Sequence, residues 1–441
     1  MDIIAAPKPV DQARYAQDLA EPTRFYGLPP KVLFCRSCTY SNQKPNSDKE
    51  YKHNRDSQKP TVAFDESGIC SACRIAEKKK SVDWKSRDLE LRELCSRYRR
   101  SDGGYDCVVP GSGGKDSFYA AHKLKFEYGM NPLTVTWAPH IYTEWGWQNF
   151  QAWMHAGFDN QLFTPNGRVH RLLTRLALEQ MFHPFQPFIM GQMYFPPRIA
   201  AQLGIPLVFY GENPTEYGNA ASADSKATKD QVYFTAPDRS QILLAGTSLN
   251  DLKNSFGLSE HDLLPYMPPD AELLHRAKVD VQYLGYYIPW HPQECYYYAV
   301  EHGGFRAAPE RTAGTYSKYS SIDDRIDDLH YYTTFVKFGI GRATYDSSQE
   351  IRNGEIDREE AVRLVRRFDG EYSTRFEKEV FEYLSMPEKH FPVASKMFEE
   401  PIVTRAYFDA LTDQFRSPHL WKFENGGWRL RHTVFGAGVS P

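Results

Sequence analysis

The sequence lacks the features that mark membrane, secreted and nucleic-acid-binding proteins. No apolar run approaches the roughly 20 residues that cross a bilayer, and the first dozen residues show no basic stretch followed by an apolar one. The formal net charge of −3 gives no overall basic field. We therefore expect a cytoplasmic protein with neither a membrane nor a nucleic acid as its partner.

Cysteine is scarce, and its total of seven is odd. Four cysteines form two Cys-x-x-Cys pairs, which are Cys35 with Cys38 and Cys70 with Cys73. In a reducing compartment this spacing favours metal ligation over disulfides. Four thiolates complete the tetrahedral coordination of Zn²⁺ and leave no open position, so we expect a structural zinc. Free thiols and an iron–sulfur cluster are the alternatives.

Composition divides the chain into four parts. Residues 1–34 form an N-terminal arm with several prolines, and residues 35–80 form the four-cysteine zinc-binding unit, whose middle is a polar loop. Residues 81–290 alternate between short apolar runs and helical spacing, and residues 291–441 are mostly helical in pattern. In the last part a helix is expected to begin near Asp357, which has capping-box spacing to Glu360.

The alternating part predicts the fold class. Buried strands are expected over residues 106–110, 133–138, 207–210 and 282–288, and helices over residues 78–100, 117–128 and 169–182. This order predicts an α/β fold, with a doubly wound, mostly parallel sheet that is covered by helices on both faces. Ligands of such sheets bind beyond the carboxyl ends of the strands.

A glycine-rich turn joins the first of these strands to a helix. It reads Pro110-Gly-Ser-Gly-Gly-Lys-Asp-Ser117. Glycine lets the backbone take positive φ and approach a ligand, and the amides at a helix start bind anions. We expect phosphate contacts from Ser112, Gly113, Gly114, Lys115 and Ser117, within a cofactor-binding turn that also includes Pro110, Gly111 and Asp116. A carboxylate at Asp116 suits phosphate only through a bridging cation, which indicates Mg²⁺.

This turn is neither a Walker A loop nor the dinucleotide G-x-G-x-x-G loop. Ser112-Gly-Gly-Lys-Asp-Ser117 resembles the pyrophosphate loop of the N-type (PP-loop) ATP pyrophosphatases, of the adenine nucleotide alpha-hydrolase fold. That group includes GMP synthetase, asparagine synthetase and the tRNA thiolases, and it cleaves ATP to AMP and pyrophosphate. The resemblance implies an ATP pyrophosphatase domain over residues 81–290, with adenine near Thr136, Trp137 and Ala138. A glycine-rich turn without a ligand is the alternative.

A narrower resemblance covers most of residues 35–370. Its segments are Pro60-Thr-Val-Ala-Phe-Asp-Glu-Ser-Gly-Ile-Cys-Ser-Ala-Cys73, Met190-Gly-Gln192, Phe209-Tyr-Gly-Glu-Asn-Pro214, Tyr283-Leu-Gly-Tyr-Tyr-Ile-Pro-Trp290, Gly303-Gly-Phe305, Ser321-Ile-Asp-Asp324 and Lys337-Phe-Gly-Ile-Gly-Arg342. Together with the loop they resemble the N-acetyl sugar amidotransferases of bacterial surface-polysaccharide (lipopolysaccharide O-antigen) and nonulosonic acid biosynthesis.

The resemblance implies that an acetamido group on a nucleotide-linked sugar becomes an acetamidino group. ATP would adenylate the amide oxygen, and ammonia would displace AMP. The family draws its ammonia from a separate glutaminase, an imidazole-glycerol-phosphate-synthase-like pair. Residue 2 is Asp, and the cysteines outside the two pairs lack a glycine-flanked nucleophile turn, so this chain is not expected to make its own ammonia.

Other polar residues are weaker candidates. Glu212 and Asn213 follow the 207–210 strand and are expected to join Lys115 and Asp116 in catalysis, although an ordinary turn is the alternative. Three cations are substrate candidates, against the alternative of solvated surface side chains: Lys318, Lys337 and Arg342. Four carboxylates form an acidic run, and at least half of them are expected on a solvated helix face: Asp323, Asp324, Asp327 and Asp328.

Two other functions compete with the amidotransferase. Some tRNA thiolases pair the same loop with Cys-x-x-Cys units, but the acidic net charge and the dispersed remaining cysteines count against that activity here. A non-catalytic zinc scaffold that binds nucleotide as a signal is the third possibility.

Overall fold

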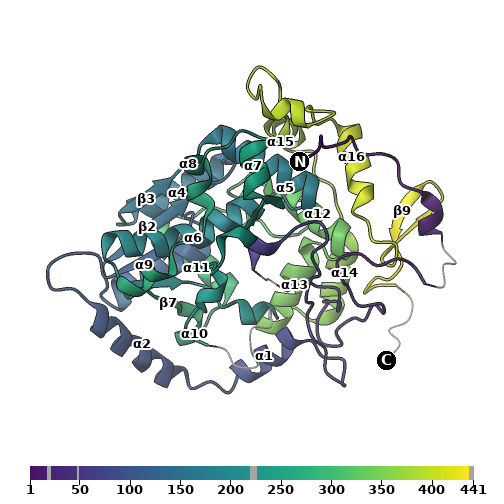
Figure 1. Ribbon diagram of the computed structural model, residues 1–441. Coiled ribbons are helices and arrows are strands. Elements are labelled where there is room, and N and C mark those ends of the chain that lie inside the picture. Colours follow the sequence, from purple (N-terminus) through teal and green to yellow (C-terminus); the bar gives the residue numbers. More distant parts are fainter. Residues whose placement is uncertain (17–20, 47–48, 219–225, 437–441) are drawn as a thin grey trace.

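A five-stranded parallel sheet forms the centre of the molecule (Figure 1). The computed structural model describes residues 1–16, 21–46, 49–218 and 226–436, so parts of the expected arm, of the loop between the cysteine pairs and of the C-terminal end lie outside the described residues. The strand order is β3-β2-β1-β4-β7. The strands are β1 (Cys107–Pro110), β2 (Pro132–Trp137), β3 (Asn160–Phe163), β4 (Leu207–Tyr210) and β7 (Asp280–Tyr283).

Helices cover both faces of this sheet, which confirms the doubly wound α/β class. Successive side chains of a strand point to opposite faces, and on β1 Val108 packs into one hydrophobic core while Val109 packs into another. The first core is closed by α5 (Gly167–Met181) and α6 (Gln186–Leu203). The second is closed by α2 (Trp84–Tyr98), α3 (Lys115–His122), α4 (Glu144–His155) and α11 (Pro292–Gly303).

Two expectations about strands differ from the structure. The segment expected as a strand over 282–288 ends its pairing at Tyr283, and α10 (Leu284–Tyr287) follows. The amide of Gly285 donates to the carbonyl of Gly211 at 2.9 Å, so the chain bends at the end of the sheet instead of extending it. Strand β3 was not expected, because it lies at the sheet edge and its residues are only partly buried or exposed.

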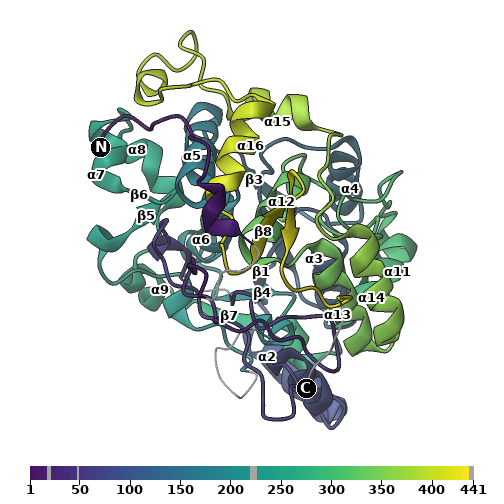
Figure 2. The same cartoon turned by 90° about the vertical axis from the view of Figure 1, so that its right-hand side faces the viewer.

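The region after residue 303 is mainly helical, with α12 (Asp327–Phe338), α13 (Arg342–Asn353), α14 (Arg358–Phe368), α15 (Glu377–Leu384) and α16 (Arg405–Gln414). Asp357 caps α14, as expected, by accepting from the Glu360 amide at 2.8 Å. A hairpin of β8 (Trp421–Glu424) and β9 (Gly427–Leu430) was not expected. Figures 1 and 2 show the N-terminal segment running beside α16 and this hairpin, where the rings of Tyr15 and Trp428 lie 4.7 Å apart.

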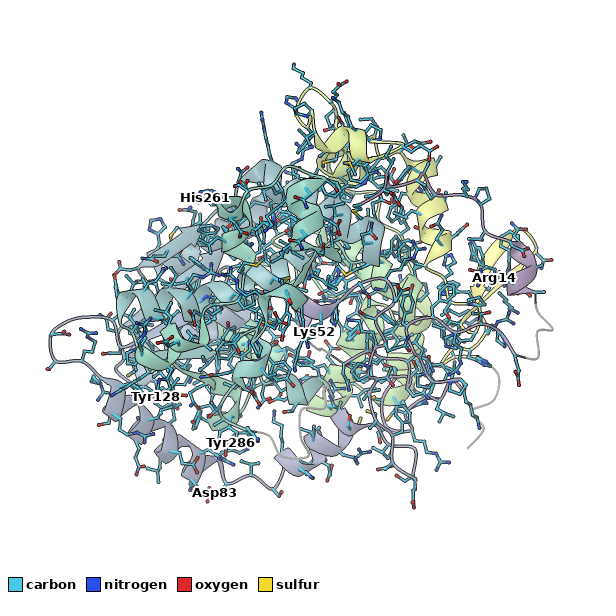
Figure 3. All side chains as sticks on the ribbon, in the orientation of Figure 1. Arg14, Lys52, Asp83, Tyr128, His261 and Tyr286 are labelled. Atoms are coloured by element: carbon cyan, nitrogen blue, oxygen red, sulfur yellow. The ribbon has the colours of Figure 1, made fainter. Side chains whose placement is uncertain are left out.

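The remaining elements are short and mostly peripheral. They are α1 (Ser71–Lys79), α7 (Leu249–Asn254), α8 (Glu260–Leu263), α9 (Ala271–Arg276), β5 (Leu243–Leu244) and β6 (Thr247–Ser248). Helix α2 is held at the outer end of the sheet domain, beside Tyr128 and Tyr286 (Figure 3). There the Tyr128 hydroxyl donates to Asp88 at 2.7 Å, and the Arg87 guanidinium lies 3.7 Å from the Tyr286 ring centre. Within the described ranges, no helix is long and apolar enough to cross a membrane.

Helix α6 packs tightly on β2 because Gly191 has no side chain. A Cβ atom at Gly191 would lie 2.2 Å from the indole of Trp137, whose ring is almost fully buried. Glycine in a helix interior costs roughly 0.5–1 kcal/mol relative to alanine. Glycine at this position therefore costs helix stability but allows α6 to approach the Trp137 indole closely.

We predict that Gly191→Ala lowers the free energy of unfolding by about 1–3 kcal/mol, because the overpacked methyl group outweighs the gain in helix propensity. Chemical denaturation measures this difference. The matched control is Gly167→Ala at the start of α5, where no heavy atom lies within 4 Å of an added Cβ and no loss is expected. Equal stability of the two variants would contradict the packing described for α6.

Candidate active site

The glycine-rich turn after β1 takes a conformation that side chains would prevent. A Cβ at Gly111 would lie 2.1 Å from the Cβ of Ser117, and one at Gly113, where φ is +85°, would lie 2.7 Å from the Cα of Phe150. Gly114 is the N-cap of α3, and its carbonyl accepts from the Ser117 hydroxyl at 3.0 Å. The turn thus folds tightly onto the first turn of α3, whose free amides suit an anion.

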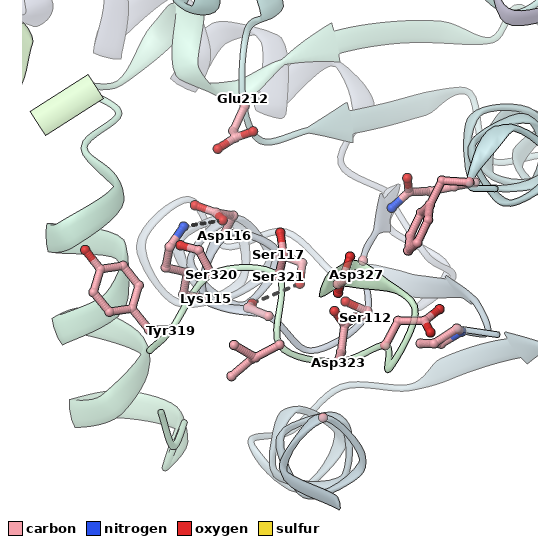
Figure 4. Close-up of a pocket in the computed structure, with 18 of the residues that line it drawn as sticks. Ser112, Lys115, Asp116, Ser117, Glu212, Tyr319, Ser320, Ser321, Asp323 and Asp327 are labelled. Atoms are coloured by element: carbon pink, nitrogen blue, oxygen red, sulfur yellow. Dashed lines mark hydrogen bonds and ion pairs between the residues drawn. The ribbon is translucent and has the colours of Figure 1, made fainter. Parts of the chain in front are cut away.

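A cavity of about 680 Å³ opens at this turn, beyond the carboxyl ends of β1 and β4 (Figure 4). Its lining includes these residues expected from the sequence: Pro110, Gly111, Ser112, Gly114, Lys115, Asp116, Ser117, Glu212 and Arg342. Pro139 also lines it, directly after the segment where adenine was expected. The cavity therefore lies where a doubly wound sheet holds its ligands.

The other expected site residues lie outside the cavity lining, which comprises described residues only. They are Gly113, Thr136, Trp137, Ala138, Asn213, Lys318 and Lys337. The Lys337 ammonium is buried and donates to the Met181 carbonyl at 2.7 Å, and Lys318 is exposed and donates to the Pro309 carbonyl at 3.2 Å. The Asn213 side chain accepts from the Thr215 amide at 3.1 Å and so caps the turn after β4.

Lys115 is a buried cation at the floor of the cavity. Its residue is 4% exposed, and its ammonium lies 2.5 Å from a carboxylate oxygen of Asp116. Burial acts to lower the pKa of Lys115, but the Asp116 and Glu212 carboxylates outweigh it and raise that pKa. Lys115 is therefore charged at neutral pH and available to a phosphate.

Asp116 and Glu212 fit a divalent cation. The second carboxylate oxygen of Asp116 is buried and has no hydrogen-bond partner. Glu212 faces Asp116 across the cavity (Figure 4), and burial together with the Asp116 charge raises the pKa of Glu212 to about 7. One oxygen of Glu212 accepts from the Tyr217 hydroxyl at 2.5 Å. Two crowded carboxylates with an unused oxygen are the ligand chemistry that Mg²⁺ prefers.

The acidic run was expected to be solvated for at least half of its members, and this expectation is wrong. Asp324, Asp327 and Asp328 are each 5–7% exposed, and Asp323 is half-buried. The segment before α12 folds back over the start of α4, because the Thr143 amide donates to the Asp323 carbonyl at 3.0 Å. Helical spacing alone does not reveal this return of the chain, so no pattern in the sequence indicates it.

The four carboxylates have different surroundings. Asp324 accepts from the amide and the ring of His140 at 2.6 and 2.7 Å, and Asp328 accepts from the Ser373 hydroxyl at 2.7 Å. These two side chains tie loops together. Asp324 also lines the cavity, together with Asp323 and Asp327, and the latter two lie beside Ser112 (Figure 4).

Arg342 is the cation of the opposite wall. Its guanidinium donates to Asp346 at 3.2 Å and to the Ser321 hydroxyl at 3.0 Å, and it lies 4.1 Å from the Tyr331 ring centre. These contacts fix the orientation of the guanidinium at the N-terminal end of α13. Arginine held in this way suits a planar anion such as a carboxylate.

The four paired cysteines come together into one cluster. Their sulfur atoms all lie within 4.8 Å of one another, with 3.9 Å between Cys35 and Cys73 and 3.7 Å between Cys38 and Cys70. The Arg352 guanidinium lies 5.1 Å from the Tyr40 ring centre, and its two terminal nitrogens are buried without a hydrogen-bond partner. Burial acts to lower the pKa of Arg352, but Tyr40 first, and then Cys38 and Cys73, raise it. Four clustered thiolates fit Zn²⁺, which would be held without an open coordination position.

The segments that carry the cysteine cluster contact two parts of the chain that line the cavity. Thr39 hydrogen-bonds to Ser348 on α13 at 2.7 Å, and α13 carries Arg342 on its cavity side. On α1, Lys79 forms an ion pair with Glu216 at 2.9 Å, in the segment that follows Glu212. The cysteine cluster is thus placed to set the distance between the two walls, and it lies outside the cavity itself.

The other three cysteines are buried. Cys95, Cys107 and Cys295 are at most 1% exposed, and burial raises the pKa of Cys95 to about 12. Burial also raises the pKa of the other two thiols. None of the three is a ready nucleophile for glutamine hydrolysis or sulfur transfer.

Comparisons with known proteins bear mainly on the C-terminal region. Residues 313–434 match a family model described as "LPS biosynthesis protein WbpG-like, C-terminal domain". No curated protein matches the chain. Among solved structures, NMN synthetase from Francisella tularensis is similar at 12% identity over 52% of this chain and all of that chain, with a TM-score of 0.23. A score this low carries no argument.

Fold and site together define an α/β protein with a glycine-rich turn at the end of its first sheet strand, whose free amides suit an anion. The stretch that matches the WbpG-like model supplies Arg342, Asp323 and Asp327, which line the cavity at this turn. The matched region and the sheet domain therefore share one cavity.

We predict that the purified protein carries about one zinc ion per chain, bound by the cysteine cluster. Cys38→Ser should remove most of this zinc, because three thiolates hold the ion far less tightly than four. Elemental analysis after gel filtration measures the content. Cys95→Ser, which changes a buried cysteine outside the cluster, should keep its zinc. Full zinc in Cys38→Ser, or none in the wild type, would rule out this assignment.

Proposed function

We propose that this chain is an ATP-dependent amidotransferase of bacterial surface-glycan biosynthesis. In the proposed reaction an acetamido group on a sugar becomes an acetamidino group, and ATP is cleaved to AMP and pyrophosphate. One observation carries the proposal: a single cavity joins the anion-binding turn to a wall from the region that matches an LPS biosynthesis model.

The turn suits the pyrophosphate end of ATP. Amides at the start of α3 and the buried Lys115 would bind the β- and γ-phosphates, and Gly111 and Gly113 let the backbone approach them. Asp116 and Glu212 would hold Mg²⁺, which when bound offsets the charge of the phosphates. A second substrate would bind in the same cavity, at the wall that carries Arg342.

The chemistry explains why ATP is needed. An amide oxygen leaves poorly, so it first attacks the α-phosphorus and pyrophosphate departs. The oxygen is now part of a phosphate ester. Ammonia adds to the amide carbon, the carbon–oxygen bond breaks, and AMP leaves with the electron pair. The protein mainly positions the reactants and stabilises charge during these steps.

The cavity indicates how the sugar would bind, and the cysteines indicate where the ammonia would come from. Arg342 would bind an anionic group of a nucleotide-linked acetamido sugar, such as a uronate carboxylate. Because the three cysteines outside the cluster are buried and not acidic, ammonia would come from solution or from a separate glutaminase. The same burial disfavours a tRNA thiolase, which needs a reactive sulfur carrier.

The test combines the protein with ATP, Mg²⁺, an ammonium salt and candidate nucleotide-linked diacetamido sugars. We predict equal amounts of AMP, pyrophosphate and a sugar that is lighter by the difference between O and NH. Lys115→Ala and Asp116→Asn should each lower kcat by on the order of 100-fold, because charge stabilisation at the phosphates is lost. Coupled assays and mass spectrometry measure these products.

The matched control for these variants is Lys123→Ala. Lys123 lies directly after α3, forms an ion pair with Glu127 and is absent from the cavity lining. It should keep wild-type activity. Release of ADP and phosphate, or full activity of Lys115→Ala, would refute the proposed function.

A further inference from the structure

Carboxylates outnumber cations in the cavity. Six carboxylates line it: Asp116, Glu212, Asp323, Asp324, Asp327 and Asp346. Lys115 and Arg342 are the lysine and arginine side chains among the described lining residues. ATP would add further negative charge. A buried site with this excess of negative charge requires more positive charge than the protein supplies. One divalent ion at Asp116 and Glu212 does not neutralise all of the carboxylates and the phosphates.

The carboxylates form two separate acidic groups. The charges that act most on Glu212 are those of Asp116 and Lys115, at the helix end of the turn. The charges that act most on Asp327 are those of Asp323, Asp324 and Arg342. Figure 4 shows Asp323 and Asp327 beside Ser112, at the opposite end of the turn from Glu212. A cation bound by the first group does not neutralise the negative charge of the second group, where Arg342 opposes several carboxylates.

Asp327 stands out because its carboxylate has no protein partner. The residue is 7% exposed and lines the cavity, yet its side chain makes no hydrogen bond or ion pair with any residue in the described ranges. Asp324 and Asp328, its acidic neighbours, are both engaged with other loops. The Asp327 carboxylate faces the cavity from a largely buried residue, which suits a ligand that donates hydrogen bonds or carries positive charge.

Asp327 lies in the cavity where the proposed reaction brings a cation that can lose a proton. Burial raises the pKa of Asp327, the neighbouring Asp323, Asp324 and Asp328 carboxylates raise it further, and Arg342 opposes them. A second divalent metal and ammonium are the two cations that the proposed reaction offers this position, and the KM values for Mg²⁺ and for ammonium distinguish them. The proposed reaction also consumes a nitrogen nucleophile, which must lose a proton before it attacks carbon.

We propose that Asp323 and Asp327 bind the ammonium ion and that the Asp327 carboxylate takes one of its protons; this inference rests on the proposed function. Loss of that proton leaves ammonia with a free electron pair. The pair forms the bond to the adenylated amide carbon, and the carbon–oxygen bond breaks with its electrons passing to AMP. The surplus proton on the new nitrogen passes to solvent, and an amidinium product remains.

The test is the dependence of amidine formation on ammonium chloride in Asp327→Asn. The KM for ammonium should rise on the order of tenfold or more, while the KM values for ATP, Mg²⁺ and the sugar stay near wild type. Hydroxylamine is uncharged near neutral pH and needs no proton acceptor. With hydroxylamine as the nucleophile, Asp327→Asn should therefore recover close to the wild-type rate, which a merely structural defect would not allow.

The matched control is Asp328→Asn, which removes an equally buried carboxylate from the same helix but from outside the cavity lining. Its KM for ammonium should rise far less than that of Asp327→Asn, because Asp328 only adds to the charge that acts on Asp327. An unchanged ammonium KM in Asp327→Asn, or a change confined to the KM of Mg²⁺ or sugar, overturns the ammonium site alone. If the wild type forms no amidine from any sugar, the proposed function fails and this inference fails with it.

Discussion

The whole site depends on one sharp corner between β1 and α3. Gly111 and Gly113 leave no space for a side chain, because the chain there lies against Ser117 and the backbone of α4. That contact directs the free amides of α3 and the ammonium of Lys115 into one cavity. A residue with a Cβ at either glycine would move the corner and separate the amides from the cation, so the anion site exists only as long as this packing holds.

The opposite wall comes from sequence far from the corner. The segment around Asp323 hydrogen-bonds to the loop after β2, and α13 places Arg342 at the cavity. The cysteine cluster packs behind α13 and behind the segment after β4, so a metal bound there would brace both walls without taking part in the chemistry. A reaction between two bound substrates depends on such fixed spacing.

The sequence pattern correctly predicted those features that depend on neighbouring residues. The strands that became β1 and β4, the turn that follows β1 and the cap at Asp357 each rest on neighbouring residues, and the structure has them as expected. The four cysteines also converge, since their paired spacing carries the signal. The burial of Asp327 could not be predicted, because it results from a contact between segments almost 200 residues apart, such as that of His140 with Asp324. The bend at Gly285 and the edge strand β3 likewise depend on the finished sheet.

The central claim is that an amide oxygen of the substrate attacks the α-phosphorus of ATP held at this corner. A sugar labelled with ¹⁸O in its acetamido carbonyl tests it directly. If the amide oxygen attacks the α-phosphorus, the label appears in the phosphate of AMP and pyrophosphate carries none. Unlabelled AMP, or label in inorganic phosphate, would contradict it.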